Sequence, residues 1–247
     1  MNQYPQLLTD SLLWDCHWQM SVAERCILQV ILSRHKPALS LEIGTYKGGS
    51  LQVVSEFSES VVSVDIDKSV KSRLGGKFPN VEFRIGDSGR VVPELVEDLN
   101  NAGRHVDFVL IDGDHSAEGV KHDIEAILGL SVQRRLVILM HDSFNPDCRR
   151  GMLEANWEGN SHVRFVELDF SVGNYHMPPV DTAQERSMWG GFACAVLEPG
   201  HRDGILKIGE RQRSKFEAIR AISIHAPAPQ QSIFRKLAGR IKRRVFS

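Results

Sequence analysis

The twelve residues from Leu39 to Ser50 constrain the fold of this chain more than any other stretch. They open with an apolar run typical of a buried strand, and a helical pattern of apolar residues follows Ser50. Between the two, Gly44, Gly48 and Gly49 permit a tight turn and a close approach of backbone to a ligand. Because ligands bind beyond the carboxyl ends of strands in open parallel sheets, this stretch predicts a nucleoside-binding corner.

The glycine spacing excludes two other nucleotide-binding motifs. The interval from Gly44 to Gly48 does not fit the G-x-G-x-x-G pattern of dinucleotide-binding enzymes, and no Gly-Lys-Ser/Thr sequence ends the turn as it does in a phosphate-binding loop. The ligand is therefore expected to be held by other means.

Strand and helix patterns alternate from Leu39 to Met140, which predicts an α/β fold with a parallel sheet and helices on both faces. Ahead of the sheet, Ser21 to Glu24 forms a capping box for a helix whose expected buried residues are Ile27, Leu28, Val30 and Ile31. Two further strands are expected at 163–168 and 191–197. A long connection between them, 169–189, is interpreted as a lid or substrate loop or as a solvated surface excursion.

Two polar clusters follow apolar strands. The first is Asp112-Gly-Asp114-His115 after the strand that begins at Val106, and the second is His141-Asp142 after the strand that begins at Arg135. Neighbouring strand ends lie about 5 Å apart, so Asp112 and Asp142 can face one ion. Oxygen ligands on adjacent strand ends suit a hard divalent cation with a site open to substrate.

These motifs, in their order from Ser21 to Pro199, resemble those of class I S-adenosylmethionine (SAM)-dependent methyltransferases. Within that superfamily they are most similar to the metal-dependent small-molecule O-methyltransferases, the group that modifies macrolide sugars and other natural products and includes proteins named for cephalosporin hydroxylation. The resemblance implies a Rossmann-like methyltransferase fold. Its sheet is mostly parallel and seven-stranded, with an antiparallel last strand at 191–197 and helices on both faces.

The resemblance also implies roles for individual residues. Asp65 would hold the ribose hydroxyls, and the loop at Asp87 and Ser88 would read the adenine. The implied cofactor-binding set is Glu42, Gly44, Thr45, Tyr46, Ser50, Asp65, Asp87, Ser88 and Asp112. The implied metal ligands are Asp112, His141 and Asp142, and the general base is Asp114 or His115.

Position 141 departs from the family, because relatives with an established metal site usually carry a carboxylate there. An imidazole is a softer ligand that favours Mn, Fe or Zn over Mg, so Mg or Mn is expected without a choice between them. Each residue also has a purely structural interpretation. Asp65 and Asp112 can cap the next helix, Asp114 or Ser116 can cap the helix near Glu118, and His141 can bond to backbone.

The function expected from this resemblance is O-methylation of a sugar, glycolipid or other small hydroxylated acceptor, assisted by a divalent cation. Two alternatives stay open. One is a metal-independent methyltransferase, acting on nitrogen or oxygen, with His115 or His141 as its base. The other is a non-catalytic scaffold that binds the cofactor at a membrane. Arg149 and Arg150 are interpreted as contacts for an anionic substrate or as solvated charges.

The composition fits an intracellular enzyme. At 247 residues and 42% hydrophobic content, the chain can bury a substantial core, and its four cysteines show neither disulfide nor zinc spacing. No signal peptide or membrane-spanning stretch is recognisable, so a cytoplasmic location is expected. The expected division is an N-terminal helical segment at 1–38, a methyltransferase domain at 39–225, and a linker with a basic amphipathic tail at 226–247.

The tail from Gln231 carries six of the 30 basic residues and none of the 31 acidic ones, which leaves a net charge of −7 elsewhere. Such a tail suits peripheral contact with an anionic membrane or docking on a partner subunit. A nucleic-acid partner is not expected, because the body of the chain is acidic and carries no nucleic-acid-binding motif. Homo-oligomers are expected by analogy with relatives alone.

Overall fold

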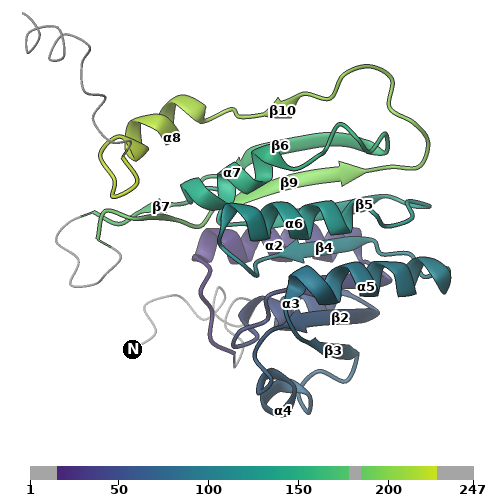
Figure 1. The fold of residues 1–247 in the computed structure, drawn as a ribbon. Helices are drawn as coiled ribbons and strands as arrows, with labels where there is room; N and C mark the ends of the chain where they lie inside the picture. The colour runs from purple at the N-terminus through teal and green to yellow at the C-terminus, as the bar shows by residue number, and fades with distance from the viewer. Residues whose placement is uncertain (1–15, 178–184, 227–247) are drawn as a thin grey trace, which may run out of the picture.

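The computed structural model describes residues 16–177 and 185–226. An eight-stranded sheet forms its centre, with strand order β10-β6-β9-β5-β4-β1-β2-β3. Figure 1 shows helices on both faces of this sheet. The strands are β1 (Leu39–Ile43), β2 (Ser60–Asp65), β3 (Val81–Ile85), β4 (Phe108–Ile111), β5 (Leu136–His141), β6 (Val163–Ser171), β9 (Phe192–Leu197) and β10 (Ile208–Gly209). The helices are α2 (Val22–His35), α3 (Gly49–Phe57), α4 (Val70–Leu74), α5 (Ser88–Asn101), α6 (Ala117–Ile127), α7 (Pro146–Glu154) and α8 (Arg213–Arg220).

The predicted α/β architecture is confirmed. Strands β1 to β5 pair in parallel, and β9 runs antiparallel between β5 and β6. The predicted strand count is one too low, because β10 adds two residues in parallel beside β6. A pairing of only two residues leaves too short a pattern to be recognised in a sequence.

Alternating side chains of the strands build two separate cores. In β1, Leu41 and Ile43 face α5, α6 and α7, whose apolar residues include Val92, Ile124 and Met152. On the opposite face, Phe108 and Leu110 of β4 pack with α2, α3 and α4. This burial on both faces is why the strands are continuous apolar runs in the sequence.

Helix α2 begins at the predicted capping box, and both of its reciprocal bonds are present. Leu28 and Leu32 are its fully buried residues, one helical turn apart. The predicted burial of Val30 is wrong, since 57% of that residue is exposed on the outer side of the helix. A four-residue offset places Leu28 and Leu32 on one stripe, and Val30 falls outside it.

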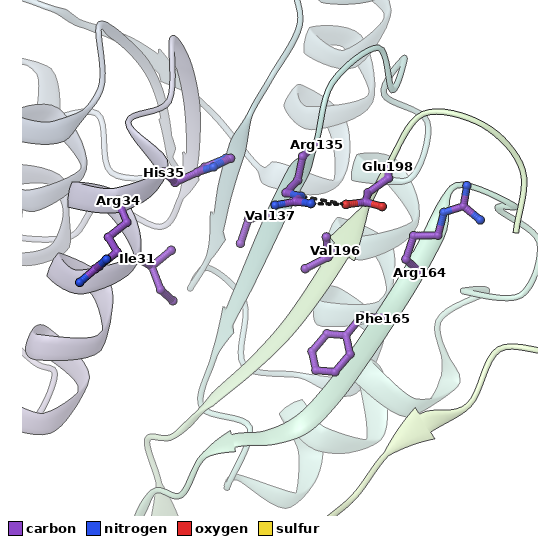
Figure 2. A pocket seen from close by; sticks show the side chains of 9 residues that line it. All are labelled: Ile31, Arg34, His35, Arg135, Val137, Arg164, Phe165, Val196 and Glu198. Carbon is purple, nitrogen blue, oxygen red and sulfur yellow. Dashed lines mark hydrogen bonds and ion pairs between the residues drawn. The ribbon is translucent and has the colours of Figure 1, made fainter.

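A shallow hollow of about 500 Å³ lies on the α2 side of the sheet, near the amino ends of the parallel strands. Figure 2 shows Val137, Val196 and Phe165 on its floor and the Arg135 and Glu198 ion pair beside them. None of the residues predicted to carry function lines this hollow. The chemistry must therefore be sought at the other end of the sheet.

Within the described ranges, every helix is too short or too polar to span a lipid bilayer. The four cysteines form no disulfide, as expected. The basic tail and its linker lie outside the described residues from 227 onward, so the predicted membrane or subunit contact stays a prediction.

Candidate functional site

A cavity of about 990 Å³ opens at the carboxyl ends of β1, β2, β3, β4 and β5. It has 28 lining residues, of which ten were predicted to carry function: Gly44, Tyr46, Asp65, Asp87, Ser88, Asp112, Asp114, His115, His141 and Asp142. Glu42, Thr45 and Ser50 do not line it. One cavity thus brings together the predicted metal and base residues and most of the predicted cofactor residues.

The β1–α3 turn forms one wall and depends on Gly44. That residue has a φ of +90°, and a Cβ placed on it would collide with the backbone carbonyl of Asp112. Its N–H donates to Val64 O at 2.9 Å, and Asp112 N–H donates to Ile43 O at 2.8 Å. Only glycine permits this close approach of β1 to the loop after β4.

Asp65 shapes the same turn through backbone amides. Its Oδ2 accepts from the N–H groups of Thr45 at 2.9 Å and Tyr46 at 2.7 Å, and its Oδ1 accepts from Asp67 N–H at 2.7 Å. Each carboxylate oxygen has further acceptor capacity, and the residue lines the cavity. Asp65 therefore fixes the turn and still offers lone pairs to a bound ligand.

Glu42 lies beneath the turn. Its carboxyl group is completely buried and accepts hydrogen bonds from Ser50 Oγ at 2.6 Å and Ser63 Oγ at 3.1 Å. Burial raises the pKa of Glu42 to about 8, since an apolar surrounding disfavours its charged form. At neutral pH the group is mostly protonated, and it links β1, β2 and α3 rather than facing the cavity.

The cluster at the ends of β4 and β5 contains two carboxylates and two imidazoles. One ligand atom each from Asp112, His115 and Asp142 lies within 4.8 Å of the others. His115 Nε2 is 3.0 Å from Asp142 Oδ2 and 3.6 Å from Asp112 Oδ1. Hydrogen bonds to Asp112 and Asp142 raise the pKa of His115 to about 10.

Asp142 is held in an uncommon backbone conformation. Its φ of +58° lies in the left-handed region, and its Oδ1 accepts from Gly190 N–H at 2.5 Å. A non-glycine residue pays a conformational cost there, which persists only where surrounding contacts hold it. The bond from Gly190, just before β9, supplies such a contact and aims the carboxylate at the cluster.

His141 lies on the buried side of the cluster. Its Nδ1 is 3.0 Å from Asp112 Oδ1, and its Nε2 is 3.4 Å from Oε1 of Glu24 on α2. Although burial opposes it, Asp112 and Asp142 raise the pKa of His141 well above its ordinary value. Burial likewise opposes the charged form of Glu24, yet the bond and charge of His141 lower the pKa of Glu24 to about 2. Each ring nitrogen of His141 thus faces a carboxylate.

Asp114 braces the start of α6. Its Oδ1 accepts from Ser116 N–H at 2.8 Å, and its Oδ2 accepts from Ser116 Oγ at 3.1 Å. Ser116 is the N-cap residue, because its Oγ accepts from Gly119 N–H at 3.0 Å. Of the two predicted base candidates, His115 is the one in direct contact with Asp142.

The long connection after β6 contributes another wall. Its described parts include β7 (Asn174–Tyr175) and β8 (Met188–Trp189), which pair in an antiparallel ribbon, while 178–184 lie outside the described residues. Asn174, His176 and Trp189 line the cavity, and the Trp189 ring lies 5.6 Å from the His115 ring in an edge-on arrangement.

The predicted contact of Arg149 with an anionic substrate is wrong. Arg149 is buried, pairs with Asp169 at 2.8 Å and Glu210 at 3.1 Å, and lies over the Phe216 ring. It fastens the C-terminal segment to α7 and β6. Arg150 pairs with Asp147 at 3.0 Å and does not line the cavity.

The cavity is strongly acidic. Its lining contains nine carboxylates and, among the described residues, no lysine or arginine. The nine are Glu24, Asp65, Asp67, Asp87, Asp112, Asp114, Glu118, Asp123 and Asp142. Sequence reasoning missed two of them as site residues. Glu24 was identified only as a capping residue, and Asp123 lies in an ordinary helical pattern that gave no signal.

Comparisons with known proteins agree with this geometry. Residues 41–143 match the model of a family described as a methyltransferase domain. The structure is similar to an O-methyltransferase from Bacillus cereus in complex with SAH, at 18% identity, with 78% of this chain and 88% of that chain covered and a TM-score of 0.53. The SAM complex of the O-methyltransferase TomG from Streptomyces achromogenes gives 18% identity, coverage of 79% and 91%, and a TM-score of 0.52.

A putative O-methyltransferase from Klebsiella pneumoniae gives 16% identity, coverage of 80% and 92%, and a TM-score of 0.52. No curated protein sequence matches this chain. At these identities the structural likeness establishes the fold, and the family match identifies the domain that contains the cavity.

Proposed function

This chain carries a class I SAM-dependent methyltransferase domain, and we propose that it transfers the methyl group of SAM to a hydroxyl of a small acceptor with help from a divalent cation. The observation that supports this proposal is the meeting of Asp112, His115 and Asp142 inside the cavity that also contains the Asp65 turn and the Asp87 loop. A cofactor region and an acid–base region thus share one space, as a transfer between two bound molecules requires.

The cofactor is assigned to the side of the cavity near β1, β2 and β3. Asp65 would accept from the ribose hydroxyls, and the loop at Asp87 and Ser88 would border the adenine. Similar folds titled as complexes with SAM or SAH support this assignment. Glu42 and Ser50 would act from beneath by fixing the turn, since their bond is buried.

The residues at the ends of β4 and β5 fit a divalent cation. Two carboxylates and an imidazole within 4.8 Å are a mixed oxygen and nitrogen donor set that Mn and related ions accept. Asp112 and Asp142 would hold the ion, which when bound would polarise the acceptor hydroxyl and lower its pKa.

The remaining steps belong to the chain's own residues. His115 is the exposed base of the cluster and lines the cavity, so we assign it to take the acceptor proton at Nε2. His141 orients Asp112 from behind through the 3.0 Å contact at Nδ1. In this assignment His141 supports the ligands, and Asp114 holds the helix from which His115 projects.

The cavity walls favour an acceptor that is uncharged or cationic. Trp189 offers an aromatic face, and Asn174 and His176 offer hydrogen bonds, a combination that suits a sugar or a small hydroxylated ring. A phosphorylated acceptor or a nucleic acid would need lysine or arginine contacts, which the described lining lacks.

The test begins with calorimetric titration of SAH into the purified protein with Mg or Mn and again after chelation. SAH release from SAM is then measured with a panel of hydroxylated sugars and phenols. We expect Asp142→Asn to lower turnover by roughly 100-fold or more and to leave SAH affinity within about threefold. Glu97→Gln, which removes an exposed carboxylate on α5, is the matched control.

Three results would redirect the proposal. Turnover that survives chelation would favour the metal-independent mechanism. SAH binding without turnover on any acceptor would favour a cofactor-binding scaffold. Absence of SAH binding under every metal condition would contradict the methyltransferase proposal itself.

A further inference from the structure

We propose that Asp123 is a recognition residue for the cofactor's base: its Oδ2 accepts a hydrogen bond from the exocyclic amino group of a 6-aminopurine. This inference rests on the proposed use of SAM and adds to it a residue that distinguishes adenine from a 6-oxopurine. Asp123 lies on α6, away from the loop at Asp87 and Ser88 that borders the same part of the cavity.

The first support is an unsatisfied buried oxygen. Asp123 is only 1% exposed, yet it lines the cavity, and its Oδ2 has no hydrogen-bond partner among the described residues. A buried carboxylate oxygen without a donor is costly, by about 1–3 kcal/mol or more for a charged group. Such an atom next to an open cavity is a site for a donor carried by a ligand.

The second support is the space left above this oxygen. A Cβ at Gly113 would lie 3.5 Å from Asp123 Oδ2 and 3.0 Å from Ile43 Cγ2. Any side chain at position 113 would therefore crowd the approach between β1, β4 and α6. Glycine at this place leaves the oxygen accessible from the cavity.

The third support is the local supply of hydrogen-bonding groups. Ser88 donates to the Asp123 carboxyl group, and the other groups that act on it are His122 and the carboxylates Asp87 and Asp114. Burial raises the pKa of Asp123 to about 6, which still leaves it mainly ionised at pH 7.5. An ionised carboxylate accepts from the amino group of adenine and repels the carbonyl oxygen of a 6-oxopurine.

A purely structural role for Asp123 makes a different prediction. If the residue only ties the loop at Ser88 to α6, its replacement should weaken the binding of every cofactor analogue by a similar factor. If it reads the base, replacement should change the ratio between analogues that differ only at purine position 6. The ratio therefore separates the two roles.

The experiment compares the dissociation constants of SAH and S-inosylhomocysteine by calorimetry at pH 7.5. Wild type should prefer SAH by roughly 10- to 100-fold, the discrimination expected of one well-placed polar contact. Asp123→Asn should reduce this ratio to near one or invert it, because its amide can donate to the 6-oxo group. Glu118→Gln, which removes another carboxylate of α6 that lines the cavity, should leave the ratio unchanged.

A wild-type ratio below threefold would overturn the inference without any variant. So would an Asp123→Asn protein that binds both analogues more weakly by the same factor. Asp123→Ser serves as a second variant if the asparagine protein is unfolded, and it should also lose the preference. Failure of wild type to bind SAH at all would instead count against the proposed function.

Discussion

Glu42 makes a prediction about stability that can be worked out from its surroundings. Its carboxyl group is completely buried, bonded to two serine hydroxyls, and has its pKa raised by burial from 4.5 to about 8. A group whose pKa is higher in the folded state favours folding at low pH. That contribution is fully present below pH 4.5 and is lost as the pH rises toward 8.

The magnitude follows from the size of the shift. Each pKa unit corresponds to about 1.4 kcal/mol, so at pH 7 the proton that Glu42 must retain costs about 3 kcal/mol of folding free energy. Glu42→Gln removes the titration and keeps a polar group of the same shape for Ser50 and Ser63. We expect the variant to gain stability relative to wild type, by a margin that grows by about 3 kcal/mol between pH 5 and pH 8.

The assay is urea denaturation of wild type and variant at four pH values from 5 to 8, without cofactor and with chelator present. Comparison at each pH cancels the titration of every other group that both proteins share. Glu97→Gln again controls for the loss of one negative charge. A difference in unfolding free energy that stays constant with pH would refute the reasoning, because it would mean that Glu42 titrates alike in both states.

Four further predictions concern the cavity and its supports. Trp189→Ala should raise the KM for the acceptor roughly tenfold, the loss of about 1 kcal/mol of aromatic contact, while SAH affinity measured by calorimetry stays unchanged. Arg149→Ala should cost about 3–5 kcal/mol in urea denaturation because it leaves Asp169 and Glu210 without their cation, whereas Arg150→Ala should cost less than about 1 kcal/mol. Glu24→Gln keeps the capping box but removes the charge that faces His141, so Mn affinity should fall by about 10- to 100-fold in titrations while the melting temperature changes little. Adding a phosphate to any acceptor that is turned over should lower kcat/KM at least about tenfold, and equal rates would contradict the role assigned to the acidic lining.

The sequence predicted the architecture well because its signals are local. The apolar run at Leu39, the capping box at Ser21 and the antiparallel strand at 191–197 each contain their own evidence within a few residues. The carboxyl ends of parallel strands must meet at one edge, so the gathering of Asp65, Asp112 and Asp142 was also predictable. The short strand β10 and the exposure of Val30 were not, since both depend on packing between distant segments.

Side-chain direction within the site was much harder to predict, and the two histidines show why. His115 and His141 both follow apolar strands, and nothing local distinguishes a residue that faces the cavity from one that faces the core. The distinction comes from Glu24, which reaches the cluster from α2 and sits 3.4 Å from His141 Nε2. With a carboxylate on each side, His141 is committed to holding Asp112 in place, and the exposed His115 is left to meet the acceptor. The division of labour between the two imidazoles is therefore set by a helix that lies outside the sheet, which explains why strand motifs alone could not assign it.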